Sequence, residues 1–248
     1  MAKLAIIGGT GLNKMSDFHV IRREVVHTPF GEPSAALTHG VLTDNEVIFL
    51  PRHGPAHNIP PHKVNYRANL WALKHIGVDR VIGVAAVGGI SAEMSPGRVI
   101  IPDQIIDYTY GRDHTLFEYD LNQVTHIDFT QPYCEQLRKR LIVAGITTGQ
   151  NIADTGTYGV TQGPRLETAK EISRMERDGC DLVGMTGMPE TSLARELDLC
   201  YASCAVVANW AAGKGDQPIS MEEIEKNLLV GMRNVRALLE NLLQTSQT

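Results

Sequence analysis

Short apolar runs alternate along the chain with segments whose apolar residues recur at helical spacing. Val81–Val87 is apolar throughout and stops at two glycines, as a strand covered on both faces would, and Tyr201–Val207 has the same character. Ser220 and Glu223 form a capping box that begins a long amphipathic helix. Buried strands that alternate with helices predict an α/β sandwich with a central mixed sheet flanked by helices.

The remaining elements follow from the same patterns. Further strands are expected at Leu4–Ile7, Val47–Leu50, Val99–Ile101, Ile105–Ile106, Ile152–Val160 and Asp181–Val183, and further helices at Asn65–His75, Gln131–Ala144, Thr168–Arg177 and Pro189–Glu196. Val41–Glu46 has the character of a hairpin turn, and the polar and aromatic segment Gly111–Gln123 is the loop most expected to move. Without repeats, low-complexity segments or linkers, the 248 residues favour one domain over positions 1–248.

Charge and cysteine content exclude several classes of function. The net charge of −5 and the pI of about 6.0 provide no basic excess, so we expect no binding to nucleic acid. No stretch approaches the length of a membrane span, which favours a soluble cytoplasmic protein without membrane contact. The four cysteines, at positions 134, 180, 200 and 204, form no Cys-x-x-Cys pair, so free buried thiols in a reducing compartment are expected.

A glycine turn after the first strand is the first candidate ligand site, because ligands collect at strand ends in open α/β sheets. In Gly8–Gly11 the glycines let backbone N–H groups close around an anion, and the Thr10 hydroxyl adds a donor. A dinucleotide-binding turn is an alternative, although the full glycine spacing and the usual acidic residue are missing. A tight turn without any ligand also remains open.

A second candidate is the pair Arg52 and His53, which follows another predicted strand. The planar guanidinium suits phosphate, and the histidine offers a second donor. A surface charge pair is the alternative. His53, His57 and His62 also suggest a metal site, but the intervening prolines exclude one helical face, so we expect no metal.

A third candidate is Val183–Glu190, where a strand ends, a hydroxyl follows and a helix begins. The free N–H groups of a helix start favour anions, and Thr186 adds its hydroxyl. Met185 suits the apolar face of a ring, although Met185 and Met188 also suit the core.

Glu167 and Asn209 form the fourth candidate, and each also has a structural explanation. Glu167 lies in the expected first turn of a helix, where a carboxylate complements the helix dipole. Asn209 lies just past an apolar run and could simply end a strand.

Taken together, these motifs resemble the purine nucleoside phosphorylase and methylthioadenosine phosphorylase family over nearly the whole chain. The resemblance depends on the number and order of the segments Ile6–Leu12, Thr28–Gly31, Arg52–Gly54, Val64–Asn69, Gly163–Arg165 and Gly184–Glu190. It implies reversible cleavage of a purine nucleoside with inorganic phosphate as co-substrate, without another cofactor or a metal. It also implies a homotrimer, either alone or assembled as a dimer of trimers.

The resemblance assigns roles by position. Phosphate would be held by Thr10, Arg52, His53, Thr186 and the backbone of Ala86, and the nucleoside by Leu166 and Met185, with Met185 along the ribose. His126 matches a histidine that reaches the 5′ end from a neighbouring subunit; a surface histidine is the alternative. Methylthioadenosine phosphorylases usually have threonine where this chain has Ala85, so one hydroxyl is missing from the phosphate site.

The base site can be derived from donors and acceptors. A 6-oxopurine presents an acceptor at O6 beside a proton on N7 in the transition state, which an asparagine such as Asn209 matches with its amide N and O. Hypoxanthine also has a proton on N1, which the Glu167 carboxylate can accept, whereas adenine has none. Methylthioadenosine phosphorylases have aspartates at the positions of Asn209 and Ala211, and both are replaced here. We therefore expect Asn209, Glu167 and His53 to act in catalysis on a 6-oxopurine nucleoside.

The 5′ end of the nucleoside is expected to be apolar. Enzymes for ordinary ribonucleosides place a histidine near the 5′-hydroxyl, where this chain has Met221, followed by Ile224. An apolar side chain suits a methylthio group, although both residues could equally form the buried face of the helix. A 6-oxopurine with a methylthio 5′ end is 5′-methylthioinosine; methylthioadenosine, or inosine and guanosine, are the alternative substrates.

Overall fold

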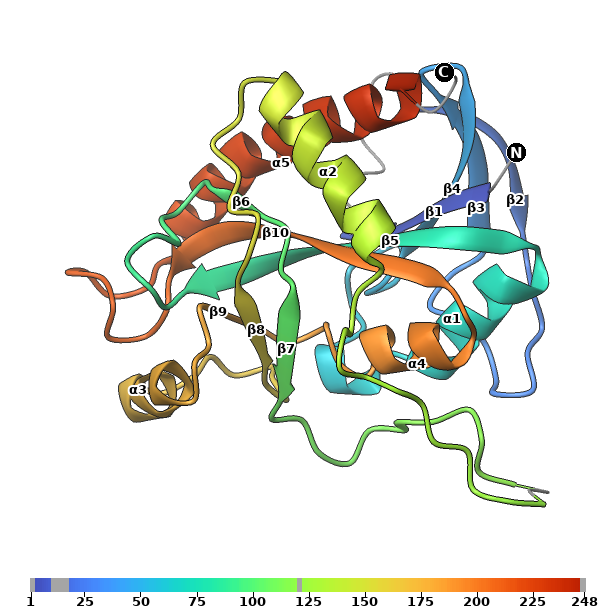
Figure 1. Ribbon diagram of the computed structural model, residues 1–248, viewed down its shortest axis with the longest axis horizontal. Coiled ribbons are helices and arrows are strands. Elements are labelled where there is room, and N and C mark those ends of the chain that lie inside the picture. The colour runs from blue at the N-terminus through green and yellow to red at the C-terminus, as the bar shows by residue number, and fades with distance from the viewer. Residues whose placement is uncertain (1–2, 10–17, 120–121, 246–248) are drawn as a thin grey trace.

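The computed structural model describes residues 3–9, 18–119 and 122–245 (Figure 1). The strands of this part of the chain are β1 (Lys3–Gly8), β2 (His19–Glu24), β3 (Leu37–Leu42), β4 (Asn45–Pro51), β5 (Val78–Gly89), β6 (Val99–Ile100), β7 (Gln104–Asp107), β8 (Thr157–Val160), β9 (Leu182–Gly184) and β10 (Cys200–Trp210). The helices are the short 3-10 helix η1 (Pro61–Lys63), α1 (Tyr66–His75), α2 (Glu135–Thr147), α3 (Ala169–Arg177), α4 (Glu190–Glu196) and α5 (Met221–Gln244). The strands form one mixed sheet flanked by helices, which confirms the predicted α/β class.

The sheet brings four strand ends to one edge. It runs in the order β2-β3-β4-β1-β5-β9-β8-β7, and β10 pairs with β5 and β6 beside this path. β1 is parallel to β4 and β5, and β10 is parallel to β5 along nearly its whole length. The carboxyl ends of β1, β4, β5 and β10 therefore meet, and Asn209 lies opposite Gly88 in the register there. Ligands collect at such an edge in open α/β sheets.

Helices cover the two faces of the sheet in pairs (Figure 1). α2 and α5 pack on one face, and α1 and α4 on the other. Because successive side chains of a strand point to opposite faces, Ile6 belongs to the apolar cluster under α5, and Ile7 to the cluster under α1. No helix within the described residues has both the length and the apolar character needed to cross a bilayer.

Polar side chains cap the starts of three helices, of which the sequence predicted the cap at Ser220. The Asn65 side chain accepts from the backbone N of Ala68 at the start of α1, and the Ser220 hydroxyl accepts from the N of Glu223 at the start of α5. Thr168 forms a reciprocal capping box with Glu171 at the start of α3. Glu167 therefore precedes the helix, and the prediction that it lies in the first turn was wrong.

Three predicted boundaries were also wrong. α2 begins at Glu135 instead of Gln131, because the preceding segment is tied to β10: the N of Cys134 donates to the carbonyl of Tyr201. Gly145 lies inside α2 instead of ending it, and a Cβ there would meet Ile152 Cδ1 at 1.7 Å. Its absence of a side chain serves close packing. The predicted strand from residue 152 to 160 is ordered as a strand only over β8.

Two of the cysteines are bonded to each other, contrary to expectation. Cys134 and Cys200 form a disulfide that spans 66 residues and joins the start of α2 to the start of β10. Cys180 and Cys204 are free and buried, as expected. The spacing of the cysteines along the chain does not reveal this bridge, because Cys134 and Cys200 are close only in the fold. Disulfides are rare in reducing compartments, so this bridge is unusual for the cytoplasmic protein expected from composition.

Candidate active site

A cavity of about 1030 Å³ opens at the carboxyl ends of the parallel strands. Its walls come from the ends of β4, β5, β9 and β10, from the segments around residues 57–61 and 164–167, and from one side of α5. The α5 wall is fixed to the sheet edge, because Asn227 Nδ2 donates to the carbonyl of Ala208 at 2.9 Å. The cavity therefore combines sheet-edge polar groups with a helical wall, and its volume suits a small organic molecule.

Glu167 and Asn209 both line this cavity. Glu167 Oε1 accepts from the Thr161 hydroxyl at 2.6 Å. Asn209 Nδ2 donates one proton to the carbonyl of Trp210 at 2.7 Å. An amide has two such protons and a carbonyl oxygen, so Asn209 keeps a donor and an acceptor for a ligand.

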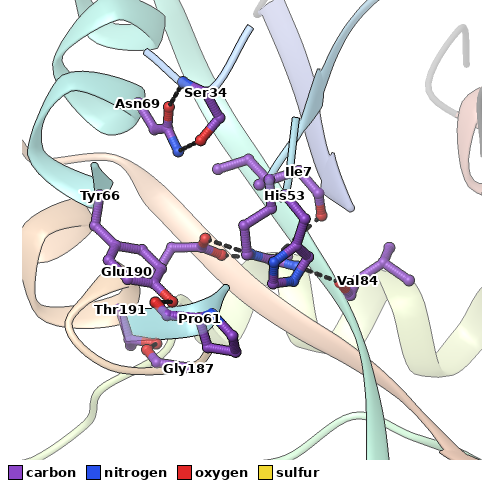
Figure 2. Close-up of polar contacts among 12 residues, drawn as sticks. Ile7, Ser34, His53, Pro61, Tyr66, Asn69, Val84, Gly187, Glu190 and Thr191 are labelled. Carbon is purple, nitrogen blue, oxygen red and sulfur yellow. Dashed lines mark hydrogen bonds and ion pairs between the residues drawn. The ribbon is translucent and has the colours of Figure 1, made fainter. Parts of the chain in front are cut away.

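Arg52 lies beside the cavity, but its guanidinium is already bonded inside the protein (Figure 2). Nε and Nη2 each lie 2.7 Å from one oxygen of Glu190. Nη1 donates to the carbonyl of Val84 at 2.8 Å, and Nη2 also approaches that of Ile7 at 3.4 Å. Burial works against the charged guanidinium, but the adjacent Glu190 carboxylate outweighs it and raises the pKa of Arg52. Four of the five N–H groups of an arginine are thus engaged, and one remains for a ligand.

His53 is neutral at physiological pH. Burial, followed by the positive charge of Arg52, lowers its pKa to about 4. Its Nδ1 lies 2.8 Å from the carbonyl of Ile59, so Nδ1 holds the proton and donates it there. In this neutral form Nε2 is an acceptor, so His53 offers a ligand an acceptor where the sequence predicted a second donor.

The segment after β9 supplies Met185 and Thr186, which line the cavity opposite Ala86. The expected order of strand, hydroxyl and helix is present, since Thr186 follows β9 and α4 begins four residues later. The Thr186 side chain is mostly buried. These groups therefore present one hydroxyl and backbone atoms at the strand ends.

Arg112 holds this segment in place. Its side chain is 9% exposed and donates from Nη1 to the carbonyls of Met185 and Met188. Nη2 donates to the carbonyls of Thr161 and Gln162, at 3.2 and 2.9 Å. Arg112 lies near the start of the loop Gly111–Gln123 that was expected to move. Its hydrogen bonds thus tie the start of this loop to the segments after β8 and β9.

The α5 wall is largely apolar. Ile224, Leu228 and Met232 line the cavity from three successive turns of the helix, and Ile219 lines it just before the helix. Met221 is 67% exposed and is not among the lining residues. Ile224, Leu228 and Met232 therefore make this wall of the cavity apolar, and Met221 does not contribute to it.

Comparison with known proteins identifies the family. The sequence profile of the phosphorylase superfamily matches residues 3–244. A protein of Pseudomonas syringae pv. tomato, named probable S-methyl-5′-thioinosine phosphorylase, is 52% identical over 246 residues, covering 99% of this chain and 100% of that one. The 6-oxopurine nucleoside phosphorylase of Pyrococcus furiosus is 47% identical over 229 residues, covering 90% of this chain and 85% of that one.

Solved structures agree with the sequence comparison. The methylthioadenosine phosphorylase of Schistosoma mansoni in complex with adenine matches with a TM-score of 0.93 at 32% identity, covering 100% of this chain and 93% of that one. The chain belongs to the phosphorylase superfamily. The cavity described above is thus the candidate active site of a phosphorylase.

The structure brings most of the predicted site residues of this phosphorylase together. The cavity is lined by Arg52, His53, Ala86, Leu166, Glu167, Met185, Thr186, Asn209 and Ile224. His126 is exposed and does not line its own chain's cavity. Thr10 lies outside the described residues. Within the described ranges, no group of three metal-ligating side chains gathers, at His53 and His57 or elsewhere.

Sequence reasoning missed two residues that shape the phosphorylase site from behind. The Thr161 hydroxyl donates to Glu167, and Arg112 donates to the carbonyls of Met185 and Thr161. Thr161 carried a weak signal, since it directly follows a strand of the sheet. Arg112 carried none, because its bonding partners are distant in sequence.

Proposed function

We propose that this phosphorylase cleaves S-methyl-5′-thioinosine with inorganic phosphate, giving hypoxanthine and 5-methylthioribose 1-phosphate. The observation that carries the proposal is that Glu167 and Asn209 line one cavity whose α5 wall is largely apolar. The polar pair suits a 6-oxopurine, and the apolar wall suits a methylthio group.

The base end distinguishes oxo- from aminopurines. Asn209 retains one amide proton for O6, and its carbonyl oxygen can accept the proton on N7. Glu167 can accept N1–H with the carboxylate oxygen that Thr161 does not use. Adenine offers an amino donor at C6 and no proton on N1, so it would leave Glu167 facing a lone pair. Unpaired polar groups in such a site discriminate between substrates by up to ~10⁴-fold.

The 5′ end distinguishes a methylthio group from a hydroxyl. Ile224, Leu228 and Met232 offer no hydrogen-bond donor, and a buried hydroxyl without a partner costs free energy. Met232 also has a polarisable sulfur that packs well against a thioether. The printed name of the Pseudomonas syringae relative points to the same substrate.

Phosphate would be held by Arg52, His53, Thr186, the backbone of Ala86 and Thr10. Because His53 Nε2 is an acceptor, it suits the P–OH group of a monohydrogen phosphate. The spare N–H of Arg52 and the Thr186 hydroxyl would bond the unprotonated oxygens. No metal or further cofactor is required.

The reaction follows from these positions. The C1′–N9 bond stretches first, and its electron pair goes to the purine while the sugar becomes oxocarbenium-like. A phosphate oxygen then forms the new bond to C1′ from the opposite face, and its negative charge stabilises the cationic sugar. The proton that phosphate loses in the net reaction is the one that hypoxanthine gains, and Asn209 stabilises it at N7. No covalent enzyme intermediate forms.

The decisive experiment is product analysis across four nucleosides with and without phosphate. S-Methyl-5′-thioinosine should be cleaved with the highest kcat/KM, and only when phosphate is present. Preference for S-methyl-5′-thioadenosine would assign the chain to the methylthioadenosine enzymes, and equal use of inosine and guanosine to general purine nucleoside phosphorylases. Turnover without phosphate would reveal a hydrolase.

The active form is proposed to be a homotrimer. His126 is exposed outside its own chain's cavity, and Met221 and Leu229 leave apolar surface on the cavity-side helix. A neighbouring chain that covers this helix would supply His126 to the 5′ end. Light scattering should give three chains or a multiple of three, and His126→Ala should raise the KM for the nucleoside without changing the KM for phosphate.

A further inference from the structure

The backbone of Thr161, next to the proposed base end of the site, is held by hydrogen bonds at both its N–H and its carbonyl. It directly follows β8, and its N donates to the carbonyl of Gly184 at 2.8 Å, which extends the pairing of β8 with β9. Its own carbonyl accepts from Arg112 Nη2 at 3.2 Å. The position of the Thr161 side chain is therefore set by the sheet and by a buried arginine.

The Thr161 hydroxyl has one proton and two acceptors near it. Glu167 Oε1 lies at 2.6 Å and the carbonyl of Gly184 at 3.4 Å. Hydrogen bonds to a carboxylate are shorter and stronger than those to a neutral carbonyl, so the proton goes to Glu167.

Glu167 depends on this bond for its orientation. It lies in an irregular segment between the cis peptide bond of Pro164 and the first residue of α3, so no helix constrains it. The nearby cation Arg165 is bonded to both oxygens of Glu171 instead. Among the side chains of the described ranges, Thr161 alone donates to Glu167.

We infer that Thr161 is a positioning residue that sets the base specificity of this phosphorylase by holding Glu167 toward the purine, an inference that rests on the proposed function. With Oε1 bonded to Thr161, Oε2 is left to accept N1–H of a 6-oxopurine. The fixed carboxylate also disfavours adenine, which has a lone pair at N1. A long side chain that is free to rotate would lose both effects, because it could turn to solvent.

The test compares S-methyl-5′-thioinosine with S-methyl-5′-thioadenosine for wild type, Thr161→Val, Thr161→Ala and Thr161→Ser. Val and Ala remove the hydroxyl, and Ser keeps it. We expect the kcat/KM ratio of the two nucleosides to fall about tenfold in Val and Ala and to be restored to within about threefold in Ser, with the KM for phosphate unchanged. Ala and Ser differ by one oxygen, so their comparison remains informative if the valine variant does not fold.

A matched control and a double variant separate positioning from a structural effect. Thr157→Val makes the same change at the other end of β8, at a residue that does not line the cavity, and should leave the ratio unchanged. In a Glu167→Ala background there is no carboxylate to hold, so Thr161→Val should change the ratio less than twofold further.

The outcomes distinguish the inference from the function on which it rests. If wild type does not prefer the 6-oxopurine nucleoside, both fail. If wild type prefers it and the ratio is the same in Thr161→Ala as in Thr161→Ser, the proposed function stands and the role of Thr161 is overturned. If Thr161→Val lowers the ratio in the Glu167→Ala background as much as it does in wild type, the role of Thr161 is likewise overturned, because the effect would not pass through Glu167.

Discussion

Arg52 and Glu190 form a bidentate, buried ion pair beside the phosphorylase cavity. Two nitrogens of the arginine lie 2.7 Å from the two oxygens of the glutamate, and both residues are almost completely buried. Tyr201 donates to the same carboxylate at 2.7 Å. Because the pair is neutral as a whole, a phosphate at the proposed site would meet one spare N–H and not a free positive charge. Hydroxyl and backbone groups must therefore contribute much of the binding.

The first prediction is that Glu190→Gln destabilises the protein strongly. It leaves the Arg52 guanidinium buried without its counter-charge, and breaking a buried pair from one side costs about 3–5 kcal/mol. Urea unfolding should show this loss. Glu176→Gln, which removes the exposed partner of Lys214, is the control and should cost less than about 1 kcal/mol. Equal losses in the two variants would contradict the importance of burial.

The second prediction concerns acid stability through His53. Its pKa is about 4 in the folded protein and 6.5 when unperturbed. Between these values the unfolded chain binds a proton that the folded protein does not, so stability falls as the pH is lowered from about 6.5 towards 4. Below that window the contribution is constant. After discounting for partial exposure of the ring, the loss should be on the order of 2 kcal/mol.

The measurement compares wild type with His53→Asn, because the difference between the two curves isolates the contribution of His53. Urea unfolding between pH 7 and pH 4 should give a shallower decline for the variant. Parallel curves would mean that His53 is protonated normally in the fold, and its assignment as an acceptor for phosphate would then be lost.

The fold was predictable wherever burial on both faces produces continuous apolar runs. β1, β5 and β10 were found in this way, and the start of α5 by its capping side chain. β2 was missed because five of its six residues are exposed and carry no alternating pattern. The start of α2 was misplaced because a tertiary bond to Tyr201, invisible in the sequence, holds the preceding residues.

The lining of the site was predictable from strand ends, whereas its hydrogen bonding was not. Arg52 and Asn209 follow apolar runs, which places them at the cavity edge. The partner of Arg52 is 138 residues away, so no local pattern indicates that its guanidinium is already engaged. Met221 was chosen for the 5′ end by position, but helical rotation turns Ile224 towards the cavity instead.

The third prediction is that Asn209→Asp shifts the preference toward aminopurines. A carboxylate accepts two protons, which matches the amino group of adenine and N7–H, and it opposes O6 of hypoxanthine. The kcat/KM ratio of S-methyl-5′-thioadenosine to S-methyl-5′-thioinosine should rise about 10- to 100-fold. The carbonyl of Trp210 loses its donor, so the variant should also lose about 1 kcal/mol of stability.

Asn227→Asp is the matched control for this change. It introduces the same charge at another amide that donates to a backbone carbonyl, that of Ala208, but Asn227 does not line the cavity. It should lose stability without a change in base preference. A similar shift in both variants would indicate a general effect of charge and would remove Asn209 from the base site.

The fourth prediction separates Ile224 from Met221 as the residue that recognises the 5′ group. Ile224→Thr replaces an ethyl group of the apolar wall with a hydroxyl, which should lower kcat/KM for S-methyl-5′-thioinosine relative to inosine about tenfold. Met221→Thr changes a side chain that is 67% exposed, so its effect on this ratio should be less than about threefold. Both variants are compared by competition between the two nucleosides at saturating phosphate. A larger effect from Met221 would mean that a neighbouring chain turns the start of α5 into the site, because within one chain this side chain does not reach the cavity.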